Sequence, residues 1–184
     1  MATQATTPGP DDDKPTWRRW LKGRTDPTPD ETSRLICDRV RDQLDLLPPR
    51  HVALFSALPG EPSLHALLSH SGPHRFYFPR VEGTELHFHR VRSEDDLVRG
   101  TFGILEPKTH LPTIEPEEID VVICPALGFG RDGSRLGRGR GFYDRILERA
   151  GSALRLGVAF PCRIVDSLPT EAHDIPMHQI IELA

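Results

Sequence analysis

Two apolar runs of strand length, separated by one segment of helix length, constrain the fold of this chain more than any other feature. The runs are IDVVICPALGF (119–129) and LRLGVAF (154–160), and continuous apolar runs are typical of strands buried on both faces of a sheet. In the intervening GFYDRILERAG (141–151), Ile146, Leu147 and Ala150 recur at helical spacing. A strand, a helix and a second strand in this order form a right-handed parallel unit. We therefore predict one βαβ unit over 119–160.

The first third of the chain also combines helical and strand patterns. In 28–47, Thr28 is placed to cap a helix, Pro29 suits its first position, and Glu31 would complete a capping box. This helix should end before Pro48, and its apolar face is formed by Leu35, Ile36, Val40, Leu44 and Leu47. HVALFSAL (51–58) has the length of a strand, and EPSLHALL (61–68) begins a second helix-like pattern.

A hairpin is predicted next along the chain. RFYFPRV (75–81) and ELHFHRV (85–91) are separated only by residues 82–84, which include Gly83, and this spacing suits an antiparallel pair. Taken with the βαβ unit, the hairpin predicts an α/β fold with a mainly parallel sheet and one antiparallel hairpin.

The length of 184 residues indicates one ordinary domain. Residues 1–13, MATQATTPGPDDD, are small, polar and acidic, and burial of such residues cannot offset the entropy lost on ordering them. We expect a disordered tail over 1–13 and a single domain over 14–184.

Charge and cysteine content exclude several classes of protein. A formal net charge of −4 argues against a general nucleic-acid or anionic-membrane surface. Cys37, Cys124 and Cys162 are odd in number and widely spaced, which supports neither a disulfide framework nor a zinc site. No apolar run approaches the roughly 20 residues of a membrane span, and the N-terminus lacks the apolar stretch of a signal peptide. A cytoplasmic protein is therefore expected.

The densest chemical signal is a glycine- and arginine-rich segment between the first run and the helix of the βαβ unit. Gly137, Gly139 and Gly141 permit backbone conformations closed to other residues and let amides approach an anion closely, and the following helix N-terminus adds a favourable dipole. Full positive charges come from Arg135, Arg138 and Arg140. The spacing matches neither a Walker loop nor GxGxxG. By itself, the segment is as consistent with an exposed loop carrying solvated arginines as with a polyphosphate site.

A longer match resolves this ambiguity. CPALGFGRDGSRLGRGRGFYDRIL (124–147) resembles the signature of the 5-formyltetrahydrofolate cyclo-ligases, approximately PxLGFDxxGxRLGxGxGYYDRxL. The resemblance extends to RFYFPRV, to GTFGILEP (100–107) and to LPTEAHDIPMHQII (168–181), and it covers nearly the whole chain from Lys14 onward. It implies a three-layer α/β sandwich, in agreement with the fold predicted from the residue patterns.

The resemblance also implies a reaction. The formyl oxygen of 5-formyltetrahydrofolate takes the γ-phosphoryl group of ATP, N10 attacks the activated carbon, and phosphate leaves to give 5,10-methenyltetrahydrofolate. The implied partners are this folate and MgATP, with no nucleic acid and no membrane, and we expect a monomer. Such a reaction requires positioning and charge neutralisation rather than a nucleophilic side chain.

Individual roles follow from the matched positions. The expected ATP-binding residues are Lys14 and Arg18, in KPTWR, and the loop residues Arg135, Leu136, Gly137, Arg138, Gly139, Arg140, Gly141, Phe142 and Tyr143. The expected substrate-binding residues are Glu61 and, from the same loop, Arg138, Gly139, Arg140, Gly141 and Phe142. Arg140 and Tyr143 are expected to be catalytic. Three positions differ from the family pattern: Trp17 replaces leucine, Phe142 replaces a common tyrosine, and Glu61 lies in an altered context, EPSL.

Asp144 and Asp174 match the two carboxylates that hold Mg²⁺ in the family, and hard oxygen ligands are what that ion requires. Each has a structural alternative, because Asp144 could complement a helix dipole and Asp174 could hold a turn before Pro176. The histidines are weaker candidates. His87 and His89 alternate on a predicted strand without a third ligand, and His173 and His178 only flank Asp174.

Two alternatives to the cyclo-ligase remain open at this point. One is a relative that keeps the fold as a nucleotide- or RNA-binding regulator and has lost catalysis. The other is a ligase for a different formylated or pterin-like compound, which the changed surroundings of Glu61 and Phe142 could permit. Lys14, Arg140 and Asp144 are all present, which favours the enzyme.

Overall fold

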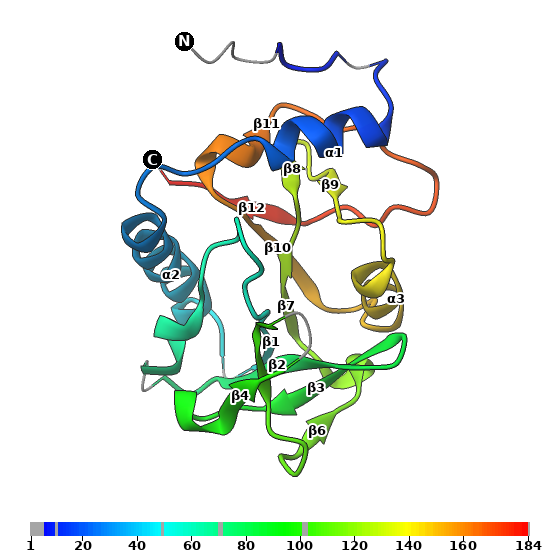
Figure 1. Ribbon diagram of the computed structural model, residues 1–184. Coiled ribbons are helices and arrows are strands. Elements are labelled where there is room, and N and C mark those ends of the chain that lie inside the picture. The colour runs from blue at the N-terminus through cyan, green and yellow to red at the C-terminus, as the bar shows by residue number, and fades with distance from the viewer. Residues whose placement is uncertain (1–5, 10, 49, 70–71, 101–102, 184) are drawn as a thin grey trace.

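A mixed seven-stranded sheet forms the centre of the computed structural model, which describes residues 6–9, 11–48, 50–69, 72–100 and 103–183 (Figure 1). Four neighbouring pairs are parallel, and the two pairs at the β6 edge are antiparallel. In spatial order the strands are β12 (Gln179–Ile181), β10 (Leu154–Val158), β7 (Val121–Pro125), β1 (His51–Ala53), β2 (Arg75–Glu82), β3 (Glu85–Arg90) and β6 (Thr113–Ile114).

Helices cover both faces of this sheet. Alternate residues of β7 point to opposite sides, as the two-residue period of a strand requires. Val121 and Ile123 pack in one core with α2 (Pro29–Asp45), whereas Val122 and Cys124 pack in another with α3 (Phe142–Arg149). Figure 1 shows α2 and α3 on the two sides of the sheet. The predicted three-layer α/β architecture is therefore confirmed, as is the parallel unit formed by β7, α3 and β10.

The prediction of one continuous strand over 119–129 is wrong. β7 ends at Pro125, and the chain turns into β8 (Gly128–Gly130), which belongs to a second, three-stranded sheet with β9 (Arg135–Leu136) and β11 (Ile164–Val165). Proline has no N–H with which to continue a ladder. A side chain at position 128 would collide with Leu21 and the backbone of Arg163, so Gly128 is what lets the small sheet pack closely.

Helix α1 (Lys14–Lys22) covers this second sheet. Trp17, Trp20 and Leu21 form a separate apolar cluster with side chains of the sheet and of the C-terminal segment. Asp13 caps the helix, because its side chain accepts a hydrogen bond from the N–H of Thr16 at 2.9 Å. This packing fixes the N-terminal helix beside the chain that leads into the glycine-rich loop.

Three predicted details in the first third of the chain are also wrong. The Thr28–Glu31 capping box does not form: Thr28 makes no side-chain cap bond, and Asp26 instead accepts hydrogen bonds from the Thr28 N–H and the Thr32 hydroxyl, each at 2.9 Å. Only His51–Ala53 of the predicted strand 51–58 pairs in the sheet. The helix-like pattern over 61–68 becomes a short 3-10 helix, η1 (His65–Ser69).

The predicted hairpin is confirmed, since β2 and β3 pair antiparallel from Tyr77 opposite Arg90 to Glu82 opposite Glu85. Gly83 in its turn has a φ of 60°, in the left-handed region that glycine adopts without strain. A small pair not predicted from sequence, β4 (Leu97–Arg99) with β5 (Leu105–Pro107), packs beside β2. The remaining short helices are η2 (Glu94–Asp96), η4 (Pro116–Glu118) and η5 (Pro161–Arg163). Among the described residues, no helix is both long and apolar enough to cross a membrane.

Candidate active site

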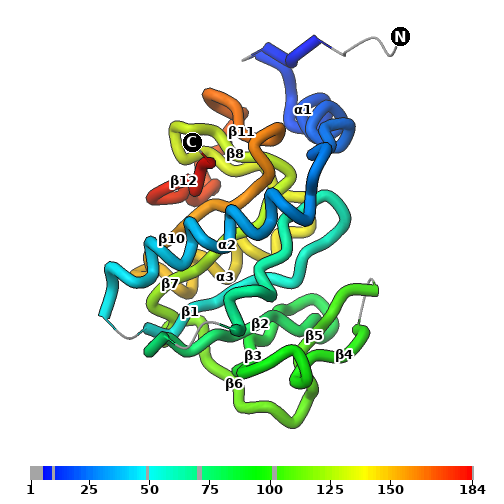
Figure 2. Tube along the Cα trace, turned by 90° about the vertical axis from the view of Figure 1, so that its left-hand side faces the viewer, coloured from blue at the N-terminus to red at the C-terminus, as the bar shows by residue number. Residues whose placement is uncertain are grey.

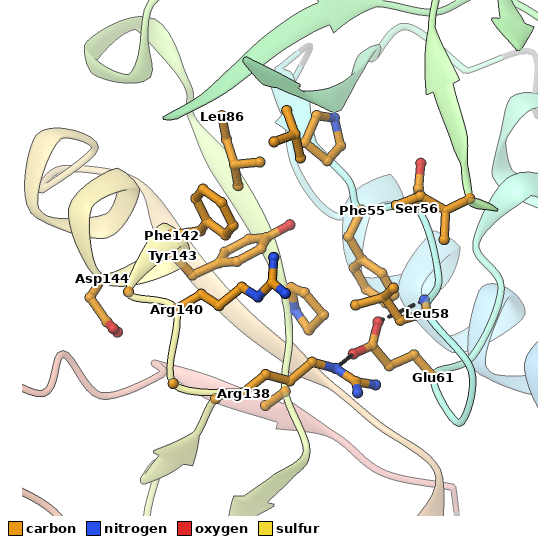
Figure 3. Close-up of a pocket in the computed structure, with 18 of the residues that line it drawn as sticks. Phe55, Ser56, Leu58, Glu61, Leu86, Arg138, Arg140, Phe142, Tyr143 and Asp144 are labelled. Carbon is orange, nitrogen blue, oxygen red and sulfur yellow. Dashed lines mark hydrogen bonds and ion pairs between the residues drawn. The ribbon is translucent and has the colours of Figure 1, made fainter. Parts of the chain in front are cut away.

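A cavity of about 300 Å³ opens at the carboxyl ends of β1 and β7, where an open α/β sheet usually binds ligands. The glycine-rich loop and the start of α3 form one wall, and residues 55–61, the β2–β3 hairpin and β5 form the others (Figure 3). On the backbone trace of Figure 2, β5 lies beside the β2–β3 hairpin. Most of the lining is apolar, and the charged groups belong to Glu61, Glu106, Arg135, Arg138, Arg140 and Asp144. The cavity therefore suits a ligand that combines an apolar body with polar or charged groups.

The conformation of the glycine-rich loop depends on two of its three glycines. Gly139 and Gly141 have φ values of 87° and 67°, which other residues rarely adopt, whereas Gly137 does not lie in this region. The prediction of a special conformation is thus correct for Gly139 and Gly141 and wrong for Gly137. Arg18 donates from Nε to the carbonyl oxygen of Gly137 at 3.1 Å, so α1 holds the loop from a distant part of the chain.

Arg135 and Asp144 form an ion pair across the loop. Arg135 belongs to β9, and its side chain is only 9% exposed. Asp144 lies in the first turn of α3. The helix-dipole explanation of Asp144 is therefore compatible with its position, but the carboxylate also neutralises a nearly buried arginine. Both residues line the cavity.

Glu61 and Arg138 form a second ion pair at the cavity wall, with Nε of Arg138 2.9 Å from Oε1 of Glu61 (Figure 3). Oε2 of Glu61 accepts a hydrogen bond from the N–H of Leu58 at 3.0 Å. Burial raises the pKa of the Glu61 carboxyl, and the Leu58 N–H and the Arg138 charge offset only part of this effect. The structure thus brings Glu61 together with Arg138 of the glycine-rich loop, 77 positions further along the chain.

Phe142, Tyr143 and Arg140 lie together at the loop end of the cavity (Figure 3). The hydroxyl oxygen of Tyr143 is buried without a hydrogen-bond partner, and this burial raises the pKa of the phenol well above 10. Tyr143 consequently stays protonated at neutral pH and is suited to donate a hydrogen bond rather than to accept a proton. The guanidinium carbon of Arg145 lies over the Phe142 ring, 5.4 Å from the ring centroid.

Lys14 and Asp174 do not line the cavity, and they meet where α1 contacts the C-terminal segment. Nζ of Lys14 lies 2.7 Å from Oδ2 of Asp174 and 3.3 Å from Oε2 of Glu171. Burial acts to raise the pKa of Asp174, but the hydrogen bonds from Lys14 and the Glu171 N–H outweigh it, and the pKa is lowered. Among the described residues, one cluster of possible metal ligands, Glu171, His173 and Asp174, has its atoms within 4.8 Å of one another, and Asp144 does not belong to it.

The other histidines that the structure describes belong to no such cluster. His89, expected as an exposed strand residue, is buried, and its Nδ1 lies 2.9 Å from the Leu111 carbonyl oxygen. His87 is exposed beside Glu82 and Glu85. His178 packs on Arg155. The pKa of its imidazole is lowered mainly by burial and also by the positive charge of Arg155.

Several lining residues were not predicted from sequence. Phe55, Ser56 and Glu106 line the cavity, and the Ser56 hydroxyl and both Glu106 carboxylate oxygens are buried without hydrogen bonds. Glu106 belongs to GTFGILEP, a segment noted above, of which Thr101 and Phe102 lie outside the described residues. The family resemblance covers Glu106 within GTFGILEP, but its residue type and its place in a short strand do not by themselves distinguish a ligand contact from a surface position.

Comparison with known proteins gives consistent results. Residues 18–182 match the model of the 5-formyltetrahydrofolate cyclo-ligase family. A 5-formyltetrahydrofolate cyclo-ligase of Haemophilus influenzae is 33% identical over 140 residues, which are 72% of this chain and 75% of the relative. The enzyme of the same name from Escherichia coli K12 is 32% identical over 71% of this chain and 76% of its own length.

Solved structures are similar as well. The NMR structure of Aquifex aeolicus 5,10-methenyltetrahydrofolate synthetase matches with a TM-score of 0.74 and 33% identity, over 91% of this chain and 88% of that one. The Mycoplasma pneumoniae protein of the same name shares the fold, with a TM-score of 0.71 over 92% of this chain and 98% of that one, at 23% identity.

Proposed function

The chain belongs to the 5-formyltetrahydrofolate cyclo-ligase family, and we propose that it converts 5-formyltetrahydrofolate and ATP to 5,10-methenyltetrahydrofolate, ADP and phosphate. One observation supports this more than any other: an apolar cavity ends at a loop that presents Arg135, Arg138 and Arg140. Such a cavity has room for a flat ring system beside a polyphosphate, which is the combination that this reaction must hold together.

The chemistry divides into two steps. The formyl oxygen attacks the γ-phosphorus of ATP, a P–O bond forms, and the bond to ADP breaks. N10 then attacks the activated formyl carbon, loses its proton, and the C–O bond breaks as phosphate leaves with its electron pair, which yields the methenyl cation. Phosphorylation is needed because an amide oxygen is a poor leaving group. The protein contributes orientation and positive charge near the phosphates.

Two of the proposed phosphate-binding cations already lie opposite an acid. Lys14 pairs with Asp174, and Arg135 pairs with Asp144. A nucleotide alone would draw the cations from their partners and leave the carboxylates uncompensated, whereas a nucleotide with a divalent cation satisfies both sets of charges. We therefore propose that nucleotide and metal bind as a unit.

Asp144 and Asp174 are the residues that would hold Mg²⁺. They fit as single-oxygen ligands, because each is partly exposed and uses one carboxylate oxygen for its cationic partner. Mg²⁺ is usually bound by one or two carboxylates, with water and substrate phosphates completing its shell. When bound, the ion would neutralise charge on the transferred phosphoryl group. Tyr143 and Arg140 would orient the folate and the phosphate at the loop end of the cavity.

A single assay tests the proposal. Protein mixed with 5-formyltetrahydrofolate, ATP and Mg²⁺ should produce the absorbance of the methenyl product together with equimolar ADP and phosphate, and omission of ATP should abolish product. Arg140→Ala should weaken ATP binding, while Arg19→Ala, at an exposed position on α1, should not. Product without nucleotide would refute the mechanism. No product under any combination of substrates would favour a binding protein without catalysis.

A further inference from the structure

Glu106 is an acidic residue of the cavity that has no role in the proposed reaction. Its side chain is 1% exposed, and neither carboxylate oxygen accepts a hydrogen bond from any described residue. The nearest cation is Arg80, whose Nη1 lies 3.5 Å from Oε2 but donates its hydrogen bond to the Pro107 carbonyl oxygen at 2.8 Å. Glu106 therefore has a counter-charge nearby and unused hydrogen-bonding capacity.

Buried polar groups are nearly always hydrogen-bonded, so two unpaired oxygens on one buried carboxylate indicate missing donors. The surrounding chain makes room for this side chain: any side chain at position 100 would collide with the Glu106 carboxylate, so Gly100 keeps the space open. Pro79, Val81 and Ile104 line the same cavity and offer flat apolar contacts. The missing donors are thus best supplied by a ligand in the cavity.

The two substrates differ in what they offer such a carboxylate. The 2-amino-4-oxopyrimidine ring of the folate presents two adjacent donors, the 2-amino group and N3–H, which match two carboxylate oxygens. Adenine presents a donor beside an acceptor, so one carboxylate oxygen would face a lone pair. The glutamate end of the folate is anionic and would be repelled.

We propose, on the basis of the proposed function, that Glu106 recognises the pyrimidine ring of the folate by accepting hydrogen bonds from its 2-amino group and N3–H. Glu61 is less suited to this task, because its two oxygens already accept hydrogen bonds from Leu58 and Arg138. Glu106 is then a specificity residue, and the apolar side chains beside it hold the faces of the ring.

The test compares Glu106→Gln with the wild type against two ligands, 5-formyltetrahydrofolate and its analogue with a methyl group in place of the 2-amino group. Dissociation constants are measured by calorimetry without nucleotide. Wild type should bind the natural folate ~10- to 100-fold more tightly than the analogue, as for a hydrogen bond to a charged group. In the variant this ratio should fall close to one, because glutamine places an amide donor against the donors of the ring.

Matched variants separate recognition from a structural role. Glu61→Gln should keep the preference for the natural folate, and Glu85→Gln, on the exposed hairpin, should behave as wild type. If Glu106 only holds β5 to β2 through Arg80, the glutamine variant should unfold at lower temperature and change its affinity for both ligands by the same factor, which would overturn the proposal. A preference lost in Glu61→Gln instead would also overturn it.

A second variant keeps the test possible if Glu106→Gln does not fold. Glu106→Asp keeps the charge but shortens its reach, and it should show a reduced preference between the two ligands; an unchanged preference in a folded Glu106→Asp protein would refute the assignment. Turnover assays keep the two proposals distinguishable. Glu106-dependent binding without product would refute the proposed function alone, whereas product formation with unchanged ligand preference in the variants would refute the Glu106 assignment alone.

Discussion

At the scale of single residues, Asp144 has two roles that one substitution separates. It pairs with Arg135 in the first turn of α3, and we propose it as a ligand of Mg²⁺. Replacing groups that merely hydrogen-bond a metal ligand already costs about 10- to 100-fold in metal affinity. Asp144→Asn should therefore raise the Mg²⁺ concentration for half-maximal activity by at least about tenfold. Titrations of activity with Mg²⁺ measure this.

The helix-dipole role predicts something different for the same variant: a loss of at most about 1 kcal/mol of stability and an unchanged metal requirement. Glu148→Gln, on an exposed position of α3, is the control. If Asp174 shares the ion, Asp174→Asn should also raise the requirement, and the double variant should lose less than the sum of the two single losses. If the Mg²⁺ titrations of activity superimpose for wild type, Asp144→Asn and Asp174→Asn, neither acid is a ligand of the metal.

At the scale of elements, α1 places two proposed ATP-binding residues, and its start depends on one cap. Asp13 accepts from the Thr16 N–H, whereas Thr28 makes no equivalent bond at the start of α2. Asp13→Ala should therefore lower the melting temperature and raise the KM for ATP, because the first turn of α1 carries Lys14. Thr28→Ala should change neither by a comparable amount. Equal effects of the two substitutions on melting temperature and KM would contradict this account.

At the scale of the whole molecule, the Lys14–Asp174 pair joins residues 160 positions apart and ties α1 to the C-terminal segment. The pKa of Asp174 is lowered in the folded state, so its stabilising contribution is present above its ordinary value of 3.8 and is lost as the pH falls through the folded value. Asp174→Asn should be less stable than wild type by at most ~1 kcal/mol near neutral pH.

This stability difference should begin to shrink near pH 3.8, where the carboxyl of the unfolded chain becomes protonated, and it should be lost below the lower pKa of the folded state, where the wild-type carboxyl is neutral as well. Urea unfolding at several pH values measures the difference, with Asp95→Asn as a control at an exposed position. A gap between wild type and Asp174→Asn that stays constant from pH 7 to pH 3 would show that the ion pair contributes no stability.

The sequence alone determined the α/β class with a mainly parallel sheet, the hairpin and the βαβ unit. These follow from local periodicity, because a side chain's tendency to be buried repeats every two residues in a strand and about every 3.6 in a helix. The glycine-rich loop was also recognisable, since Gly139 and Gly141 occupy backbone conformations that few other residues tolerate. Periodicity could not show that the run 119–129 is divided between two sheets, because both parts are buried and apolar.

Only the tertiary structure decided which charges meet. The packing of distant elements joins two ion pairs, Lys14 with Asp174 and Arg138 with Glu61. No local pattern in the sequence predicts such pairs. The same holds for Glu106, which lies in a two-stranded ribbon and becomes a cavity residue because β5 packs beside β2. A charged residue looks alike in sequence whether water or a cavity surrounds it, and burial, which sets its chemistry, is a property of the folded chain.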